Sequence, residues 1–310
     1  MRCVEGMTTN PTHTAQNTEN TDRTTTPLLV DAAWLAEHRK DENLRIVDAT
    51  TFLEQPEGDG YYVVSSGRQA YEREHIPGAV FADLLTEFAD TDAPTTFTAL
   101  DSQAFAERMG ALGIGDGAHV VIYDQGVNMW ATRLWWNLRL EGFETISVLD
   151  GGLTAWKDAG LPLASGTETL PAATFTARRR PELYADRARV LAAIQDDSQL
   201  LINVLDEDTF SGHRLTYDRA GHIPSSVNVP FQGALTPEGR VAGVEDARAL
   251  FAESGALESS KQPITYCGSG IAATLMAFEL ARLGREDVAV YDGSMTEWAA
   301  DETLPLQTGR

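Results

Sequence analysis

The chain has 310 residues, a formal net charge of −22 at neutral pH and an isoelectric point near 4.5. This length exceeds that of one ordinary small domain, so we expect two domains. The negative charge disfavours binding to nucleic acid or to anionic membranes, and no apolar run is long enough to span a bilayer. The N-terminus lacks the apolar segment of a signal peptide, so we expect a soluble protein of the cytoplasm.

The N-terminal segment is the first feature along the chain. Residues 8–27 contain no large apolar side chain, so we expect residues 1–27 to form a disordered tail. One of the only two cysteines, Cys3, lies in this tail, and a disulfide to the other, Cys267, is therefore not expected. The small number of cysteines favours a reducing compartment.

In the first half of the chain, short apolar runs alternate with a helical pattern. The predicted strands are 45–48, 119–123 and 146–150, and the predicted helix over 131–140 ends before Gly142. Strands that are separated by helices predict an α/β fold with a parallel sheet covered by helices on both faces.

The second half repeats this order. Strands are predicted over 200–204, 263–266 and 288–291, and the helix over 273–283 ends before Gly284.

Sequence blocks also recur between the two halves, in the same order and at similar spacing. They pair His75–Pro77 with His222–Pro224, Val120–Asp124 with Pro263–Cys267, and Asp150-Gly151 before Trp156 with Asp292-Gly293 before Trp298. Such a long repeat indicates a duplicated domain and not a solenoid. We therefore predict an N-terminal domain over 28–164, a linker over 165–185 and a C-terminal domain over 186–310.

Cys267 is the strongest candidate for chemistry. It ends a predicted strand and precedes a helix, where free backbone N–H groups favour an anion and lower the pKa of a thiol. Gly268 and Gly270 follow it, which a buried core cysteine would not require. At the matching position of the first half stands Asp124, so the chain has one nucleophilic centre.

These blocks resemble the tandem-domain rhodanese family of sulfurtransferases over roughly residues 28–308. The resemblance rests on the His-Ile-Pro-Gly block at 75–78, the Asp-Gly blocks with their tryptophans, and the loop that begins at Cys267. It implies two rhodanese-like domains, of which only the second is catalytic. The carboxylate of Asp124 cannot carry a transferable sulfur, so the first domain would be structural and form one wall of the cleft.

The loop after the cysteine indicates the sulfur donor within this family. Members that use thiosulfate carry basic side chains there, whereas members that use 3-mercaptopyruvate read Cys-Gly-Ser-Gly-Val-Thr/Ala. This chain reads Cys267-Gly-Ser-Gly-Ile-Ala272, so it resembles the second type with Ile271 in place of valine. A dianion such as thiosulfate gains from adjacent cations, and a neutral loop suits a monoanionic keto acid better. Thiosulfate remains the alternative donor.

The expected reaction passes through a persulfide on Cys267, whose outer sulfur goes to a low-molecular-weight thiol, a thioredoxin-like protein or cyanide. The loop amides, including those of Gly268, Gly270, Ile271 and Ala272, would form a nest for the negative sulfur. Ser269 would hydrogen-bond the substrate or relay a proton, or else act only as a helix cap. We expect no metal and no cofactor, because no zinc spacing, Walker loop or dinucleotide fingerprint is present.

Family resemblance also implies that His75 is the partner of Ser269 across the domain cleft. A structural role before proline stays open, because the histidine recurs as His222 in the other copy. The carboxylate that some members place upstream is missing, and Ser65 and Ser66 stand near its position.

An arginine fork is expected for the substrate carboxylate. The family position before Phe-x-Gly holds Thr209 in this chain, so we predict Arg214 or Arg219 as the ligand, with Arg68 or Arg73 as a fallback.

Two other functions compete with sulfur transfer from a small molecule. One is a sulfur-relay or regulatory module that accepts sulfur from a protein. The other is phosphatase-like chemistry, which needs an arginine at the end of the loop, where Ala273 and Thr274 stand. We expect Asp150 and Asp292 to organise the backbone at their strand ends.

Overall fold

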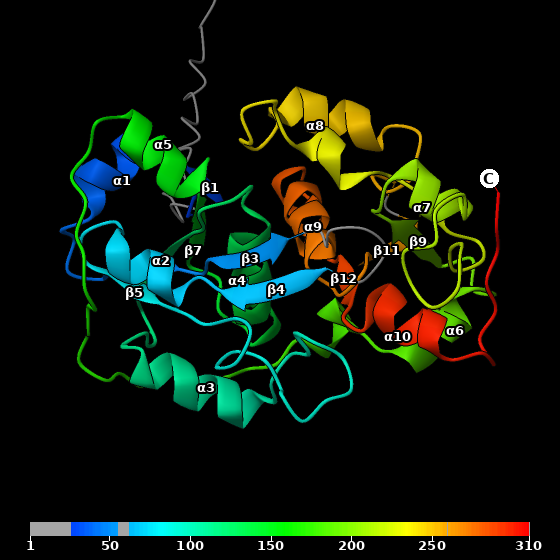
Figure 1. The fold of residues 1–310 in the computed structure, drawn as a ribbon, viewed down its shortest axis with the longest axis horizontal. Coiled ribbons are helices and arrows are strands. Elements are labelled where there is room, and N and C mark those ends of the chain that lie inside the picture. The colour runs from blue at the N-terminus through cyan, green and yellow to red at the C-terminus, as the bar shows by residue number, and fades with distance from the viewer. Residues whose placement is uncertain (1–25, 55–61, 259, 310) are drawn as a thin grey trace, which may run out of the picture.

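The structure is a computed structural model, and it describes residues 26–54, 62–258 and 260–309. The predicted tail lies outside the described residues except for Thr26 and Pro27. Two five-stranded sheets lie in two halves of the molecule, and all neighbouring strands within each sheet run parallel (Figure 1). The predicted α/β fold with two parallel sheets is confirmed.

The first sheet has the strand order β1-β7-β6-β2-β5. Its strands are β1 (Leu29–Val30), β2 (Leu44–Asp48), β5 (Ala79–Phe81), β6 (His119–Tyr123) and β7 (Ile146–Leu149). A separate antiparallel ribbon is formed by β3 (Thr51–Glu54) and β4 (Val63–Ser66).

The second sheet has the order β10-β9-β11-β12-β8. Read from β8 to β10, this order repeats that of the first sheet from β1 to β5. Its strands are β8 (Tyr184–Ala185), β9 (Gln199–Asn203), β10 (Val227–Asn228), β11 (Gln262–Tyr266) and β12 (Ala289–Tyr291). Each strand predicted from the apolar runs is present. Tyr184 and Ala185, which the sequence assigned to the linker, pair with β12 at the edge of the sheet.

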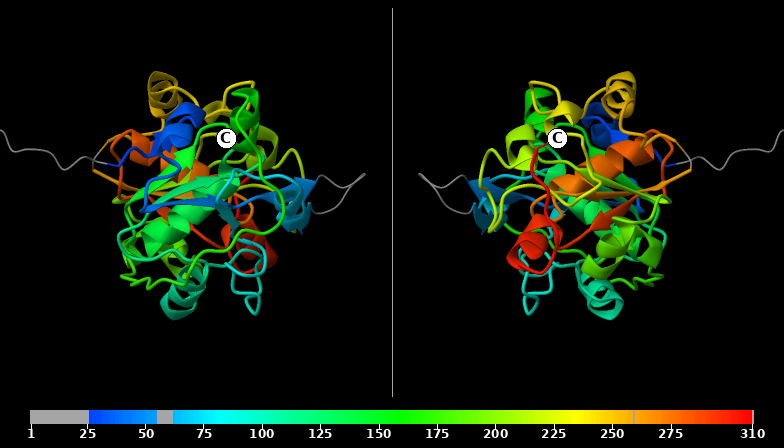
Figure 2. Two further views of the ribbon diagram at one scale, coloured as in Figure 1. Left: turned by 90° about the vertical axis from the view of Figure 1, so that its left-hand side faces the viewer. Right: turned by 90° about the vertical axis from the view of Figure 1, so that its right-hand side faces the viewer.

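Helices lie above and below the strands in both end-on views (Figure 2). The first domain has α1 (Ala32–His38), α2 (Arg68–Arg73), α3 (Ser102–Ala111), α4 (Met129–Leu140) and α5 (Gly152–Asp158). The second has α6 (Arg187–Ala193), α7 (Glu207–Ser211), α8 (Val244–Phe251), α9 (Ala272–Arg282) and α10 (Ser294–Ala300), with 3-10 turns η1 (Pro181–Leu183) and η2 (Phe231–Ala234). None of the helices in the described part of the chain has the length and apolar character to cross a membrane.

Helices α4 and α9 end in the same way, as the two glycines predict. Gly142 and Gly284 adopt φ angles of +79° and +89°, which a residue with a side chain rarely adopts. The residue after each glycine donates its N–H back to the helix, Phe143 to Leu138 and Arg285 to Leu280, at 3.0 and 2.9 Å. This is the Schellman arrangement, and it satisfies carbonyls that would otherwise be orphaned.

The alternation of side chains along the strands divides the core into three layers. In β6, Val120 and Ile122 face one cluster, while Val121 and Tyr123 face another. The first of these clusters continues into the second domain, where Ile202 of β9 joins it. The two domains thus share one central core, and each has an outer core of its own.

Helices α4 and α9 meet in the middle of this shared core. The ring of Trp135 meets that of Phe278 edge to face, with centroids 5.1 Å apart. Trp136 and Trp130 are also buried in the shared core. The two helices are equivalent in the repeat, so the domains meet through matching surfaces.

Candidate active site

Cys267 lies directly after β11, and the loop from Cys267 to Ile271 leads into α9. The thiol is free and its residue is 3 % exposed. Gly270 has a φ of +75°, so the backbone requires glycine there. Gly268 is not among the residues with positive φ, so its lack of a side chain has another cause.

The loop presents a set of unused amides. Within the described residues, hydrogen bonds engage the N–H groups of Cys267 and Gly270 but not the other amides around them. The N–H groups without an acceptor belong to Gly268, Ser269, Ile271, Ala272 and Ala273. Such a concentration of free donors at a helix N-terminus stabilises an anion.

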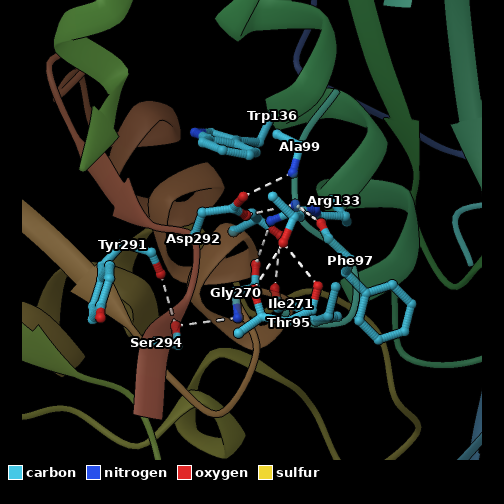
Figure 3. A network of polar contacts seen from close by, with 12 residues as sticks. Thr95, Phe97, Ala99, Arg133, Trp136, Gly270, Ile271, Tyr291, Asp292 and Ser294 are labelled. Atoms are coloured by element: carbon cyan, nitrogen blue, oxygen red, sulfur yellow. Dashed lines mark hydrogen bonds and ion pairs between the residues drawn. The ribbon is translucent and has the colours of Figure 1, made fainter. Parts of the chain in front are cut away.

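Ser294 holds the loop in place from the start of α10. Its Oγ accepts hydrogen bonds from the amides of Cys267 and Gly270, both at 3.1 Å, and donates to the carbonyl of Tyr291 at 2.7 Å. Figure 3 shows the bonds to Gly270 and Tyr291. It adopts a φ of +48°, which is costly for a residue with a side chain. The sequence analysis did not identify Ser294 as part of the site. The one indication in the sequence is that a hydroxyl residue stands at position 294 where the matched position of the first domain holds Gly152.

The next two residues of α10 hold the loop as well. The amide of Met295 donates to the carbonyl of Cys267 at 3.0 Å. Thr296 donates to the carbonyl of Gly268 from both its amide and its hydroxyl, at 2.9 and 2.8 Å. Since three successive residues of one helix hold it, the loop is fixed in position before a substrate binds.

The first domain reaches the loop through Arg133 of α4. Its guanidinium lies 2.6 Å from Asp292 and donates to the carbonyls of Gly270, at 3.2 Å, and of Phe97 (Figure 3). Both charged side chains are almost fully buried. Asp292 also accepts from the amide of Ala99 at 2.8 Å, so the pair joins the first domain to the back of the loop.

Asp150 makes the corresponding contact in the opposite direction. It accepts from the amide of Val241 at 2.9 Å and lies 3.7 Å from Arg240. The Asp-Gly blocks therefore do more than organise their own strand ends, because the carboxylate of each domain binds the backbone of the other. A contact of this kind cannot be inferred from one copy of the repeat.

Asp124 fills the matching loop of the first domain with its own side chain. Its carboxylate accepts four backbone hydrogen bonds, from Gly126 and Asn128 at 2.8 and 3.1 Å and from Trp130 and Ala131 at 3.0 Å each. Complete burial raises the pKa of Asp124, and the four amides oppose that rise. Gly126, Asn128 and Trp130 match Ser269, Ile271 and Ala273, so three of the amides that lie free around Cys267 are occupied in the first domain.

His75 lies away from the Cys267 loop, and the implied pairing with Ser269 is corrected. Its Nδ1 donates to the carbonyl of Tyr71 at 2.8 Å, its ring stacks on that of Tyr71, and its Nε2 lies 3.9 Å from Glu168. His222 is held in the same way, with Nδ1 on the carbonyl of Phe210 and its ring on the phenyl group. The shared role of the two histidines is structural.

Ser269 lies in the middle of the loop and is half-buried. Its hydroxyl has no hydrogen-bond partner within the described residues. The alternative of a helix cap is also corrected, because the N-cap of α9 is Ile271 and no side chain caps that end. The hydroxyl of Ser269 is therefore available to a ligand.

The two candidate arginines differ in their surroundings. Arg214 ion-pairs with Asp206 and donates to the hydroxyl of Thr209 at 3.1 and 3.3 Å, and its side chain is 54 % exposed. It therefore covers the position where the family arginine is replaced by threonine. The fallback Arg68 is paired with Glu87 at 2.8 Å.

Arg219 is used for structure, which corrects its predicted role as a substrate ligand. Its guanidinium donates to four backbone carbonyls at the end of α10, at 2.6 to 2.9 Å. They belong to Trp298, Ala299, Asp301 and Leu304. These bonds cap the orphan carbonyls of the helix and leave the fork unavailable.

A cavity of about 660 Å³ lies between the two domains, next to residues that contact the loop. Pro94 and Thr95 line it from the first domain, while Tyr217 and Thr296 line it from the second. Both of these second-domain residues contact Gly268. The cavity therefore has a wall from each domain and adjoins the loop through Tyr217 and Thr296, although no residue from Cys267 to Ile271 lines it.

Comparison with known proteins agrees with this geometry. Models of the rhodanese-like domain match residues 31–159 and 186–301. The chain is 34 % identical to a 3-mercaptopyruvate sulfurtransferase of Escherichia coli over 288 residues, which cover 91 % of this chain and 98 % of that one. It is 32 % identical to a thiosulfate sulfurtransferase of Rattus norvegicus over 280 residues, which cover 87 % and 91 %.

The crystal structure of SseA from Escherichia coli, a protein of the 3-mercaptopyruvate sulfotransferases, superposes with a TM-score of 0.75 at 33 % identity. The match covers 87 % of this chain and 99 % of SseA. The chain therefore belongs to the rhodanese family, as a sulfurtransferase with two rhodanese-like domains.

Proposed function

We propose that this enzyme transfers sulfur from 3-mercaptopyruvate, through a persulfide on Cys267, to a thiol acceptor or to cyanide. The observation that carries the proposal is the set of free amides around a single buried thiol, at the end of a neutral Gly-Ser-Gly loop. The residues that bind and react come from the second domain, and the first domain supplies one wall of the cavity.

In the first half-reaction, the thiolate of Cys267 attacks the sulfur of 3-mercaptopyruvate. A sulfur–sulfur bond forms while the bond between sulfur and C3 breaks, and the electron pair of that bond leaves with pyruvate as its enolate. Protonation of the enolate at C3 gives pyruvate, and we assign the relay of that proton to the hydroxyl of Ser269, which has no partner within the described residues.

The persulfide is the species that the loop suits best. Its outer sulfur is an anion when deprotonated, and the free amides of residues 268, 269 and 271–273 supply donors for it without rearrangement. Because these donors are backbone groups fixed by α10 and by Arg133, they are already oriented when charge develops.

In the second half-reaction, an acceptor attacks the outer sulfur and the thiolate of Cys267 leaves. Cyanide becomes thiocyanate, and a thiol becomes a persulfide, such as that of a low-molecular-weight thiol or a thioredoxin-like protein. The enzyme returns to its starting form, so the kinetics are of the ping-pong type.

We propose Arg214 as the ligand for the substrate carboxylate. In support, it is half-exposed, lies in the segment that carries Tyr217 and, within the described residues, keeps a guanidinium donor free beyond its contacts with Asp206 and Thr209.

The decisive experiment compares steady-state kinetics with 3-mercaptopyruvate and with thiosulfate, at saturating cyanide, and detects the added sulfur on Cys267 by mass spectrometry. We expect a larger kcat/KM for 3-mercaptopyruvate. Thiosulfate is the rival donor because its sulfurtransferases are almost as similar in sequence, and a larger kcat/KM for thiosulfate would reverse the assignment. Turnover of neither donor would favour a sulfur-relay module.

A further inference from the structure

Tyr217 lies directly on the Cys267 loop, in the segment between α7 and β10. A Cβ atom built on Gly268 would meet the hydroxyl of Tyr217 at 2.2 Å and its ring carbons Cζ and Cε1 at 3.1 and 3.3 Å. Real Cβ atoms essentially never approach another atom as closely as the first of these distances. The phenol therefore occupies the volume that a side chain at position 268 would need.

This contact explains why position 268 is glycine. The φ of Gly268 is not positive, so this angle by itself does not demand glycine. Gly270 is different, because its φ of +75° itself demands glycine. The restriction at Gly268 comes from its neighbour, and Tyr217 is held against the outer core of the second domain.

The hydroxyl of Tyr217 has no hydrogen-bond partner within the described residues, and Tyr217 lines the cavity between the domains. Burial and the adjacent Cys267 raise the pKa of Tyr217 far above its usual value. The phenol is therefore protonated near neutral pH and can donate a hydrogen bond to a ligand.

We propose that Tyr217 determines which sulfur donors the Cys267 loop accepts. Its ring keeps position 268 free of a side chain, and its hydroxyl donates a hydrogen bond to the donor molecule bound at Cys267. This role rests on the proposed function, and it assigns the selectivity of that site to a residue outside the loop.

The charges around the cavity also favour a monoanionic donor over a dianionic one. Its lining carries four carboxylates and one arginine, Arg187, which lies 3.1 Å from Asp301. Arg214, which acts electrostatically on Tyr217, is paired with Asp206. A cation on the side chain of residue 268 could neutralise a dianion such as thiosulfate, but Tyr217 leaves no space for it. The dianion then meets about twice the repulsion that a monoanion meets.

The first experiment separates the hydroxyl from the ring. Tyr217→Phe keeps the ring, and we expect kcat/KM for 3-mercaptopyruvate to fall about tenfold, as for a lost hydrogen bond to a charged group. Tyr71→Phe is the matched control, since it removes a phenol hydroxyl that donates to the carbonyl of Ala79 within the first domain, and it should leave kcat/KM of the folded enzyme unchanged. If Tyr217→Phe has wild-type kcat/KM, the hydroxyl does not contact the donor.

The second experiment tests the steric restriction by a double-mutant cycle. Gly268→Ala should lower kcat/KM at least about tenfold in the wild-type chain but have little further effect in the Tyr217→Ala chain, because the effects of contacting residues are not additive. In the Tyr217→Ala/Gly268→Arg chain, we expect the ratio of thiosulfate to 3-mercaptopyruvate activity to rise at least about tenfold. Additive effects, or an unchanged ratio, would overturn the proposal.

A third measurement does not depend on sulfur transfer. The rate at which iodoacetamide alkylates Cys267, read by peptide mass spectrometry, should rise severalfold in Tyr217→Ala, because the front of the loop is opened. If Tyr217→Ala and the wild type are alkylated at equal rates, Tyr217 does not cover the Cys267 loop, whatever the activity of the enzyme. If the wild type transfers sulfur from neither donor while alkylation does accelerate, the proposed function fails and the steric role of Tyr217 stands.

Discussion

The two copies of the strand–loop–helix unit use matching backbone amides in opposite ways. In the first domain, the carboxylate of Asp124 accepts four amides of its loop, three of which match free amides of the second domain. In the second, the shorter polar group of Cys267 accepts none, and the amides lie free beside a thiol. One copy uses its donors for stability, and the other reserves them for a ligand.

The residues that lie behind the two loops also differ between the domains. Gly152 in the first domain leaves no room for a side chain, because its Cβ would meet the carbonyl of Asp124 at 2.0 Å. Ser294, its counterpart, places a hydroxyl under the open loop and takes up a costly backbone angle to do so. A loop that keeps its amides for a ligand therefore gains an internal acceptor that holds its shape.

The largest expected effect is on the open loop itself. Cys267→Ser should lower kcat at least about 10³-fold with every donor, because the hydroxyl is a poor nucleophile and cannot carry the sulfur. Steady-state kinetics and the absence of a persulfide by mass spectrometry check this. Cys3→Ser is the matched control and should be fully active. Activity in Cys267→Ser would end the proposed mechanism.

The closed loop should respond in stability instead. Asp124→Ala leaves four buried amides without an acceptor, so we expect the free energy of unfolding to fall by about 2–4 kcal/mol in urea denaturation. Asp124→Asn keeps one side-chain oxygen and should lose less. The kcat/KM of the folded fraction should not change in either variant. A wild-type midpoint in Asp124→Ala would mean that the carboxylate contributes nothing to the fold.

The strand ends beside the two loops give a pH-dependent test. Burial raises the pKa of Asp48 from 3.8 to about 6, and its counterpart in the second domain is Asn203, which does not titrate. The folded state binds this proton more tightly, so stability should fall as pH rises from about 4 to above 6, by up to about 3 kcal/mol. Asp48→Asn should remove this part of the dependence. Parallel urea titrations at pH 4.5 and 7.5 compare the two, and an identical pH profile would contradict the assignment.

Ser294 should give a smaller effect, on rate. Ser294→Ala removes the acceptor for the amides of Cys267 and Gly270, and we expect kcat/KM to fall about 10- to 100-fold. Ser294→Gly copies the first domain and relieves the backbone angle, so it should be more stable than Ser294→Ala but equally slow. Should both variants match the wild type in kcat, the hydroxyl does not position the loop.

The smallest expected effect separates the two arginines. Arg214→Ala should raise KM for 3-mercaptopyruvate about 5- to 10-fold with little change in kcat, as expected for lost ground-state binding. Arg219→Ala should leave KM unchanged and lower the melting temperature, because its four carbonyl partners lose their cap. The reverse pattern would place the carboxylate ligand at Arg219.

Much of the fold could be predicted from local sequence. The apolar runs gave the positions of the main strands, and Gly142 and Gly284 marked the ends of the two matching helices, because strand length and left-handed backbone angles leave clear local signals. Cys267 was identified in the same way, since a thiol followed by two glycines at a helix start is a local pattern.

The rest of the site depends on contacts between distant segments. Ser294, Tyr217 and Arg133 act on the loop from other elements, and nothing near them in the sequence indicates that they face it. The two wrong assignments have the same origin, because His75 and Arg219 are residue types that often bind ligands. Only the fold shows that the hydrogen bonds of Arg219 are already used by backbone carbonyls.

The central core that both domains share makes the stability of the catalytic half depend on the other half. If the chain were cut between the domains, the buried face of α9, with Phe278 at its centre, would lose its cover from α4 and Trp135. The first domain is therefore one half of a joint folding unit. Heat should melt the whole enzyme in a single cooperative transition, and we expect the first domain to be as necessary to the stability of the fold as the second.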